Sequence, residues 1–367
     1  MDFEISDAQY AAREVASHVL GAEHSEWQVT WRRLSAAGLV GLTVPASAGG
    51  GDLGMLEGAE VLIEVGRTAA DLPLLATIAT VPTIEASGNA LLRDRWLSML
   101  GDGSAVFDLA LAEEGVDDPA QCTTLATRTD HGWRLSGRKL AAQFAGAADR
   151  VVVPARSRGN TVGLFLVDPS STGVELVRAT LTSGEPAHTI VLNEVGVADA
   201  DVLAPPPAGA ATVAGSFALE MFRQHLLVGL SAMQIGLAEA ALRLTAQHVS
   251  ERVQFGRPLG SFQAVEMRAA DAFIDLEAMR WTMYEAAWQL DAGERAAAAV
   301  SIAKFWACEG GHRIASTAQH LHGGIGVDLE YALHRYFLRM KTIEFTLGGA
   351  EAQLSALWAA GTEMAQL

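Results

Sequence analysis

The sequence contains only two cysteines in 367 residues, Cys122 and Cys308, and they lie far apart. Neither a disulfide framework nor the paired spacing of zinc and thiol-redox sites can be built from them. The sequence also lacks an unbroken run of 18 apolar residues, which predicts no membrane span. The first residues, "MDFEISDAQYAAREVA", have no basic segment followed by an apolar one, as a secretory signal would. We therefore expect a cytoplasmic protein with reduced thiols.

Basic residues are scarce. There are 26 Lys and Arg against 43 Asp and Glu, which gives a formal net charge of −17. This balance argues against a nucleic acid as partner, because binding to its backbone requires clustered Lys and Arg. It leaves room for an anionic ligand, since a local basic patch can act against the global charge.

The apolar pattern divides the chain into three segments. Residues 1–105 carry apolar residues at helical spacing, whereas residues 106–208 form short β-branched runs separated by Gly, Pro and Asp. Residues 209–367 contain long helical patterns of the kind that pack as an antiparallel bundle. The sequence predicts an α+β fold made of an N-terminal helical domain, a middle antiparallel β domain and a C-terminal four-helix-bundle domain.

Two turn signals add detail to this division. The Asp-His-Gly at residues 130–132 predicts a hairpin in the β domain. The three glycines at residues 49–51 are not followed by Lys-Ser/Thr, and no strand clearly precedes them. We interpret them as a connecting loop rather than a phosphate-binding loop.

The stretch "ERVQFGRPLGSFQAV" ends one helical pattern and starts another, and "HLHGGIGVDLEYALHRYFLRMK" follows later. A pyrophosphate needs a guanidinium or several N–H donors. Arg252 supplies the first, and Gly323 with Gly324 lets backbone N–H groups approach closely. Phe255 can lie against a flat ring, and Gln263 offers both a donor and an acceptor. The two stretches therefore suit one end of a dinucleotide.

Together with the order of the three segments, these motifs resemble the acyl-CoA dehydrogenase family over nearly the whole chain. Its pattern Arg-x-x-Phe-Gly-x-Pro-Leu-x-x-Phe-Gln is filled at every position, and the glycines of its Gln-x-x-Gly-Gly-x-Gly are also present. The Gln of the second pattern is His320 here, and histidine can still donate to a phosphate. The residues that fill the two patterns are Arg252, Phe255, Gly256, Pro258, Leu259, Phe262, Gln263, Gly323, Gly324 and Gly326.

The resemblance implies FAD as cofactor and an acyl-CoA thioester as substrate. In this family the adenosine and pyrophosphate half of FAD is bound across a subunit interface. The chain that supplies the Arg, Phe, Gln and Gly-Gly holds the tail of its neighbour's flavin. The resemblance therefore implies a dimer or tetramer, with electron-transfer flavoprotein as the expected electron acceptor.

The chain departs from the family at the catalytic base, which is a carboxylate that removes a proton next to the thioester. The two positions where family members carry this Glu are Leu347 and Leu226 here, and leucine cannot accept a proton. Glu220 and Glu344 lie nearby in sequence. Each is either a relocated base or a solvated surface residue.

The chain also departs where the family holds the flavin ring. Glu113 and Lys139 match the family pattern, but the Thr, Trp, Thr and Asn of that pattern are replaced, in this order, by Ala112, Ala141, Gln143 and Phe144. The groups that would grip the ring are therefore missing together.

The residues that this chain would lend to a neighbour are present, and those that it would use itself are absent. We therefore expect the non-catalytic subunit of an α2β2 heterotetramer, resembling actinobacterial-type members that dehydrogenate bulky or steroid side-chain CoA thioesters. A homotetrameric enzyme with a relocated base and a flavin-free scaffold remain as alternatives. No metal site is expected, because His320 and His322 do not share a helix face and no acidic or Cys partner lies close in sequence.

Overall fold

The computed structural model describes residues 4–21, 26–116, 118–158, 161–206 and 213–364, without the side chains of 213–216 and 360–364. The chain divides into two compact units, and the division falls within one long helix. Unit 1 comprises Met1–Trp27, Met55–Asp71 and Leu227–Leu367, and unit 2 comprises Gln28–Gly54 and Leu72–Leu226.

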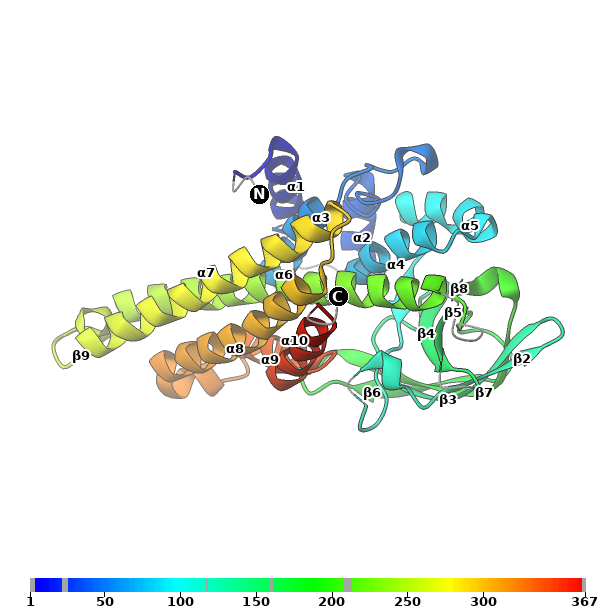
Figure 1. The fold of residues 1–367 in the computed structure, drawn as a ribbon. Coiled ribbons are helices and arrows are strands. Elements are labelled where there is room, and N and C mark those ends of the chain that lie inside the picture. Colours follow the sequence, from blue (N-terminus) through cyan, green and yellow to red (C-terminus); the bar gives the residue numbers. More distant parts are fainter. Residues whose placement is uncertain (1–3, 22–25, 117, 159–160, 207–212, 365–367) are drawn as a thin grey trace. The chain divides into compact units, whose positions relative to one another are not determined.

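The order of elements is helices, then strands, then helices, which confirms the predicted fold class (Figure 1). The domain boundaries at 105/106 and 208/209 stay a prediction. The helices are α1 (Asp7–Leu20), α2 (Trp27–Ala36), α3 (Met55–Thr68), α4 (Leu74–Ala86), α5 (Ala90–Gly101), α6 (Val213–Glu251), α7 (Gln263–Asp291), α8 (Ala297–His322), α9 (Leu333–Phe345) and α10 (Ala350–Met364). The strands are β1 (Phe107–Leu109), β2 (Leu125–Thr129), β3 (Gly132–Ala142), β4 (Arg150–Arg156), β5 (Val162–Val167), β6 (Val174–Thr180), β7 (Pro186–Val197), β8 (Val202–Ala204), β9 (Val253–Gln254) and β10 (Arg257–Pro258).

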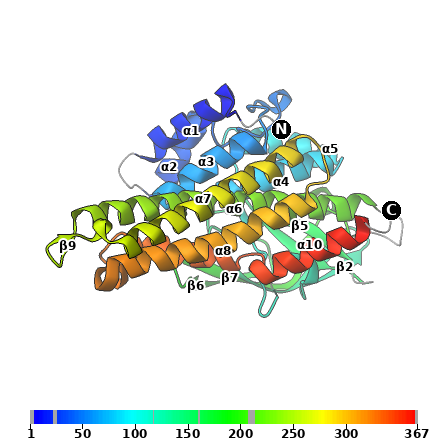
Figure 2. The same ribbon diagram turned by 60° about the vertical axis from the view of Figure 1, so that its left-hand side comes forward.

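In unit 1 the long helices α6, α7 and α8 lie side by side, with the β9–β10 hairpin at one end (Figures 1 and 2). Helix α3 crosses α6 at backbone contact. A Cβ on Gly66 would lie 2.1 Å from the Met233 carbonyl oxygen, and one on Gly236 would lie 1.9 Å from that of Ile63. Only glycine permits so close an approach, so these two positions fix how α3 packs on α6.

A buried polar network ties the helices of unit 1 together. The fully buried Glu60 of α3 accepts from Arg13 Nε of α1 at 2.7 Å and from the Tyr284 hydroxyl of α7. A second cluster, made of ion pairs between Glu and Arg side chains, joins α3, α6 and α7. Because each buried carboxylate has a cation or hydroxyl partner, the cost of burying its charge is largely offset. The residues of the second cluster are Glu64, Arg67, Glu239 and Arg280.

Unit 2 is built on one sheet in the order β6-β7-β3-β2-β4-β5-β8, with β1 added beside β4. Five of its pairings are antiparallel, as expected. However, β1 runs parallel to β4, and β2 pairs in parallel with β4 at Leu125↔Arg156. The sheet is therefore mixed rather than wholly antiparallel. A parallel pair needs a long connection, which short-range turn signals do not reveal.

The turn signals correspond to turns in the structure. Strands β2 and β3 are joined by a two-residue loop, with Thr129 paired to Gly132, so the predicted hairpin is confirmed. Strand β8 ends at Ala204, directly before Pro205, since proline cannot continue a ladder. Residues 49–51 lie in a loop that connects a 3-10 turn to α3, as predicted.

The segment Phe217–Glu251 of α6 is long and apolar enough to cross a membrane by length and composition alone. However, 83% of its most apolar window is buried within the structure. Core helices pass the same test, so this helix is weak evidence for a membrane span.

A buried ion pair joins the segment after β1 to β3. Lys139 Nζ, which is fully buried, donates to Glu113 Oε1 at 2.6 Å. The Thr124 hydroxyl donates to the same oxygen at 2.6 Å, and Thr123 donates through its backbone N–H and its hydroxyl to the other. Burial raises the pKa of Glu113, but the hydrogen bonds from Lys139, Thr123 and Thr124 outweigh it and lower the pKa to about 2.

We expect Lys139→Met to lower the free energy of unfolding by about 3–5 kcal/mol, because it leaves a buried carboxylate without its cation. The folded pKa of Glu113 is depressed, so its stabilisation is present above about pH 4.3 and lost as the pH falls toward 2. Urea unfolding of the wild type and Lys139→Met at pH 7 measures the first effect, and that of the wild type and Glu113→Gln at pH 7 and pH 3 measures the second.

The exposed pair Arg128–Asp199 provides the control, and Arg128→Met should leave the unfolding free energy nearly unchanged. If Lys139→Met unfolds at the same urea concentration as the wild type, the pair is not structural.

Candidate functional site

The reversal between α6 and α7 is a two-residue hairpin rather than an open loop. Gln254 pairs with Arg257 and Val253 with Pro258, which leaves Phe255 and Gly256 as the loop. Both loop residues have positive φ, +54° and +80°. Positive φ at both loop residues is typical of the type I′ turns found in two-residue hairpins. Such turns favour Asn or Gly at the first loop position. A phenylalanine there is strained.

The Phe255 side chain is also 90% exposed. Its ring centroid lies 6.1 Å from that of Phe262 in an edge-to-face arrangement, and the Arg257 guanidinium carbon lies 3.9 Å from the Phe262 ring centroid. Strain and a large exposed aromatic side chain at one residue are typical of a functional position. The Phe255 side chain therefore points outward, and it contacts Phe262, on which Arg257 packs.

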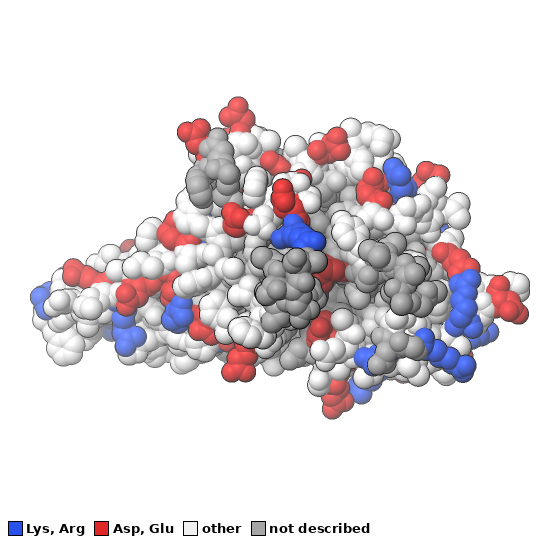
Figure 3. Space-filling view, viewed as in Figure 1, with Lys and Arg blue, Asp and Glu red and all other residues white. Residues whose placement is uncertain are grey.

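Arg252 and Gln263 stand at the two ends of this corner. The Arg252 carbonyl accepts from Leu259 N at 2.9 Å, which closes the corner, and both side chains are exposed. Within the described part of the chain, no carboxylate lies at ion-pair distance from Arg252. On the face drawn in Figure 3, the β9 end carries a few separate basic side chains with acidic ones between them. The Arg252 guanidinium can therefore bind an anion.

Helix α8 ends at His322, and Gly323 follows with φ +62° and ψ −139°, a conformation that glycine alone adopts readily. A Cβ added at Gly323 or Gly324 would meet nothing within 4 Å, so the space above them is open. The Gly323 N–H donates to the His320 carbonyl and is thus already engaged. His320 lies exposed in the last turn of α8.

The two motifs lie together in the structure. The His248 ring stacks on the His322 ring with centroids 4.4 Å apart and planes inclined by 21°. His248 precedes Arg252 by one helical turn, and His322 directly precedes Gly323. Sequence reasoning missed this contact, because nothing in either stretch indicates which residue of the other it meets.

Neither position where the family carries its catalytic Glu holds an acid. Leu226 of α6 is 1% exposed. Leu347 follows α9 with φ +60°, and its carbonyl accepts from Gln353 Nε2 at 3.1 Å. Leu347 is thus part of a strained turn that is hydrogen-bonded to Gln353 of α10. Its side chain has no group that could accept a proton.

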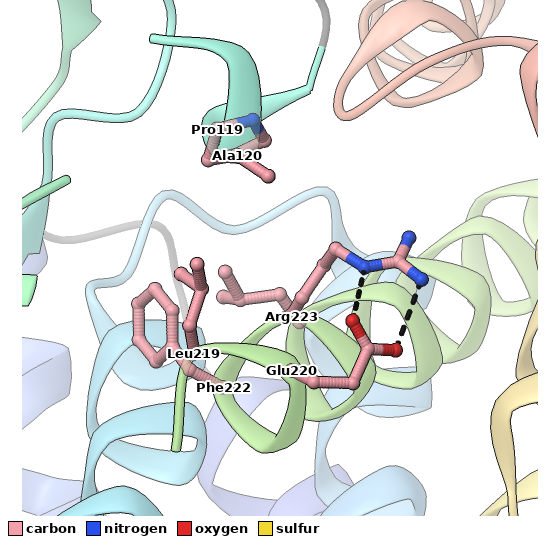
Figure 4. Close-up of a pocket in the computed structure, with 7 residues that line it drawn as sticks. Pro119, Ala120, Leu219, Glu220, Phe222 and Arg223 are labelled. Atoms are coloured by element: carbon pink, nitrogen blue, oxygen red, sulfur yellow. Dashed lines mark hydrogen bonds and ion pairs between the residues drawn. The ribbon is translucent and has the colours of Figure 1, made fainter. Parts of the chain in front are cut away.

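Glu220 lines a small pocket in unit 2, shown in Figure 4. Its two carboxylate oxygens accept from Arg223 Nε and Nη2, both at 3.0 Å, and Gln224 Nε2 donates at 2.9 Å. The pocket has a volume of about 90 Å³ and is otherwise largely apolar. The carboxylate is therefore part of a paired, hydrogen-bonded group. The other lining residues are Pro119, Ala120, Leu219, Phe222 and Leu226.

Glu344 is engaged in a similar way in unit 1. Its Oε2 accepts from Lys341 Nζ at 2.8 Å, and its Oε1 lies 3.1 Å from His312 Nδ1. Its side chain is only 13% exposed. Both alternative bases thus have charged or polar partners within this chain. Protonation of either carboxylate would weaken its hydrogen bonds to these partners.

The residues where the family holds the flavin ring have structural roles here. Ala112 and Ala141 are exposed, and Ala141 has φ +61° at an irregularity in the β3–β7 pairing. The buried Asp108 accepts from the Phe144 N–H at 2.9 Å, and burial raises its pKa to about 7. Glu113 and Lys139, which match the family pattern, form a buried ion pair with each other. In this chain the pair therefore stabilises the fold.

A model of the acyl-CoA dehydrogenase N-terminal domain matches residues 6–104, and one of the C-terminal domain matches residues 218–361. Acyl-CoA dehydrogenase FadE27 of Mycobacterium tuberculosis (strain ATCC 25618 / H37Rv) is 34% identical over 346 residues, which are 92% of this chain and 88% of FadE27.

Two solved structures are similar throughout. A chain of the ChsE4-ChsE5 complex from Mycobacterium tuberculosis is 31% identical with a TM-score of 0.88, and the match covers 100% of both chains. A chain of a Tcur3481-Tcur3483 steroid ACAD variant is 36% identical with a TM-score of 0.87, and the match covers 98% of both chains. With its two domain matches and these relatives, the chain belongs to the acyl-CoA dehydrogenase family.

Proposed function

We propose that this chain is a subunit of an acyl-CoA dehydrogenase that binds the adenosine and pyrophosphate half of FAD for a catalytic partner and supplies no base of its own. Members of the family are FAD-binding flavoproteins. The observation that carries the proposal is the outward-facing corner. Phe255 is 90% exposed in a strained turn, whereas both base positions are leucine.

The residues present fit the tail of FAD. Arg252 would pair with the pyrophosphate, and the open space above Gly323 and Gly324 would admit a phosphate close to the backbone. Phe255 would lie against a flat ring, with Gln263 and the exposed His320 as hydrogen-bonding groups. Bound flavin supplies the hydride acceptor for α,β-dehydrogenation, and this chain's residues hold its distal half.

The partner in this proposal is a second acyl-CoA dehydrogenase-like subunit in an α2β2 assembly. Both solved relatives are described as pairs of differently named chains, ChsE4-ChsE5 and Tcur3481-Tcur3483, and the second is described as a steroid ACAD. A bulky acyl-CoA, such as a steroid side-chain thioester, is therefore the substrate class that we propose for the assembly. We further propose electron-transfer flavoprotein as acceptor and the cytoplasm as location.

One observation favours a second candidate, a homotetrameric enzyme that uses Glu220 as its base. Glu220 is the only carboxylate among the residues that line the described pocket, and Leu226 lies beside it. Against this candidate, both carboxylate oxygens of Glu220 already accept hydrogen bonds from Arg223 within this chain.

Arg252→Ala should remove most of the flavin from the assembly, because the pyrophosphate loses its guanidinium. The assembly is obtained by co-expression with an acyl-CoA dehydrogenase-like chain encoded beside this one. We expect the wild-type chain alone to hold little flavin and the assembly to hold two FAD per four chains, measured by absorbance and native mass spectrometry.

Arg243→Ala is the matched control, since Arg243 is an exposed arginine on the same helix. It should leave flavin content unchanged. A homotetramer of this chain with four FAD, or an Arg252→Ala assembly that keeps its flavin, would contradict the proposal.

Phe255→Gly separates strain from binding. Glycine adopts positive φ without cost, so the unfolding free energy should stay the same or rise by up to about 1 kcal/mol. Flavin affinity should nevertheless fall, because the exposed ring is gone. Denaturant unfolding and FAD titration of the same preparation measure both. Unchanged affinity would show that Phe255 does not contact the cofactor.

Glu220→Gln tests the second candidate. Removal of a general base lowers turnover by about 10²- to 10⁴-fold. We expect instead that turnover of the assembly with an acyl-CoA stays within about twofold, since the base belongs to the partner. Glu344→Gln serves as the parallel test of the other carboxylate. A large loss of turnover with full flavin content in either variant would place the base in this chain.

A further inference from the structure

The stacked histidines His248, which is half-buried, and His322, which is buried, are polar groups that the proposed function does not use. His322 is 5% exposed, and its Nδ1 lies 2.8 Å from the Ala318 carbonyl oxygen. A carbonyl only accepts, so Nδ1 carries the proton. The Nε2 atom is buried and has no hydrogen-bond partner among the described residues. His322 is therefore a neutral ring whose free lone pair meets no donor.

Aromatic and charged groups lie near this pair. The ring centroid of Tyr331, in the segment before α9, lies 5.4 Å from that of His322, and the Tyr331 carbonyl oxygen lies 2.8 Å from His334 Nδ1. Arg252, directly after α6, acts electrostatically on His248. Burial, then His322 and Arg252, lower the pKa of His248, and Glu251 offsets them only in part.

We propose that the uncharged His248–His322 stack positions Arg252 beside the Gly323–Gly324 turn, and that acid releases the flavin tail by protonating this stack. The inference rests on the proposed function. His248 lies one turn before Arg252, and His322 directly precedes Gly323. The contact between these two rings therefore sets the distance between Arg252 and the Gly323–Gly324 turn. Both histidines are positioning residues, since neither is assigned a contact with FAD.

The direction of the pH effect follows from the surroundings. A proton on Nε2 of His322 would place a charge in a buried space without an acceptor, next to a second imidazole and near Arg252. The stacked state thus binds fewer protons than the separated state, because burial lowers the pKa of both rings. Its stability is full above about pH 6.5 and declines as the pH falls below that value.

The first experiment uses the full chain alone and needs no flavin. Imidazole resonances of the ¹³C-labelled chain are followed from pH 8 to pH 5, and the two signals are assigned from their loss in His248→Phe and His322→Phe. We expect both to titrate below the ordinary histidine pKa of about 6.5. If either titrates at or above that value, the stack is not held neutral and the inference is wrong.

The second experiment measures the affinity of the assembly for added FAD after removal of its flavin. From pH 7.5 to 5.5, affinity should fall by up to about tenfold for each histidine that must take a proton on separation. His322→Phe keeps an aromatic ring in the stack but cannot titrate. Its affinity should therefore fall distinctly less over the same range.

His225→Phe is the matched control, because His225 is a half-buried histidine of α6 with the same kind of Nδ1 contact, 2.8 Å from the Met221 carbonyl oxygen. Its pH profile should follow that of the wild type. A wild-type affinity independent of pH, or a His322→Phe profile parallel to it, overturns the inference. Arg252→Ala with wild-type affinity at pH 7.5 would instead show that the proposed function has failed.

Discussion

The turn at Phe255 and Gly256 is the constraint on which the candidate site depends. A helix of 39 residues reverses into one of 29 residues through a hairpin with only two loop residues. Such a loop requires positive φ at both positions, which costs a phenylalanine of order 1–3 kcal/mol. As a consequence the Phe255 ring is exposed outside the bundle instead of packing inside it. A partner that covers Phe255 would offset both its strain and its exposure.

The acidic groups of the chain show the opposite arrangement, since each candidate is engaged within the chain. Glu113 is bound by Lys139 and two threonines, Glu220 by Arg223, and Glu344 by Lys341. A general base must exchange a proton with substrate, and a carboxylate whose oxygens are already hydrogen-bonded to cations is poorly suited to that task. These three carboxylates are therefore engaged within the described part of the chain, whereas Arg252 and Phe255 at the corner are exposed.

Much of the fold could be predicted from the sequence, because periodicity reports burial directly. The helical and β segments and the hairpin at residues 130–132 followed from local pattern. The parallel pairing of β1 with β4 did not, since it joins segments separated by two other strands. At the candidate site, Arg252 and Gly323 could be named from motifs. Their connection through His248 and His322 could not, because helix register and crossing are set by packing across the whole bundle.

In the function that we propose, the histidine stack lets the tail site form within one chain and serve another. Its rings lie within unit 1 and join the last turn before Arg252 to the residue before Gly323. The surfaces of both segments remain exposed, with open space above the glycines. A preformed site of this kind loses little conformational entropy on binding, which favours affinity. Its ligand must come from outside the chain, as the flavin of a neighbouring subunit would.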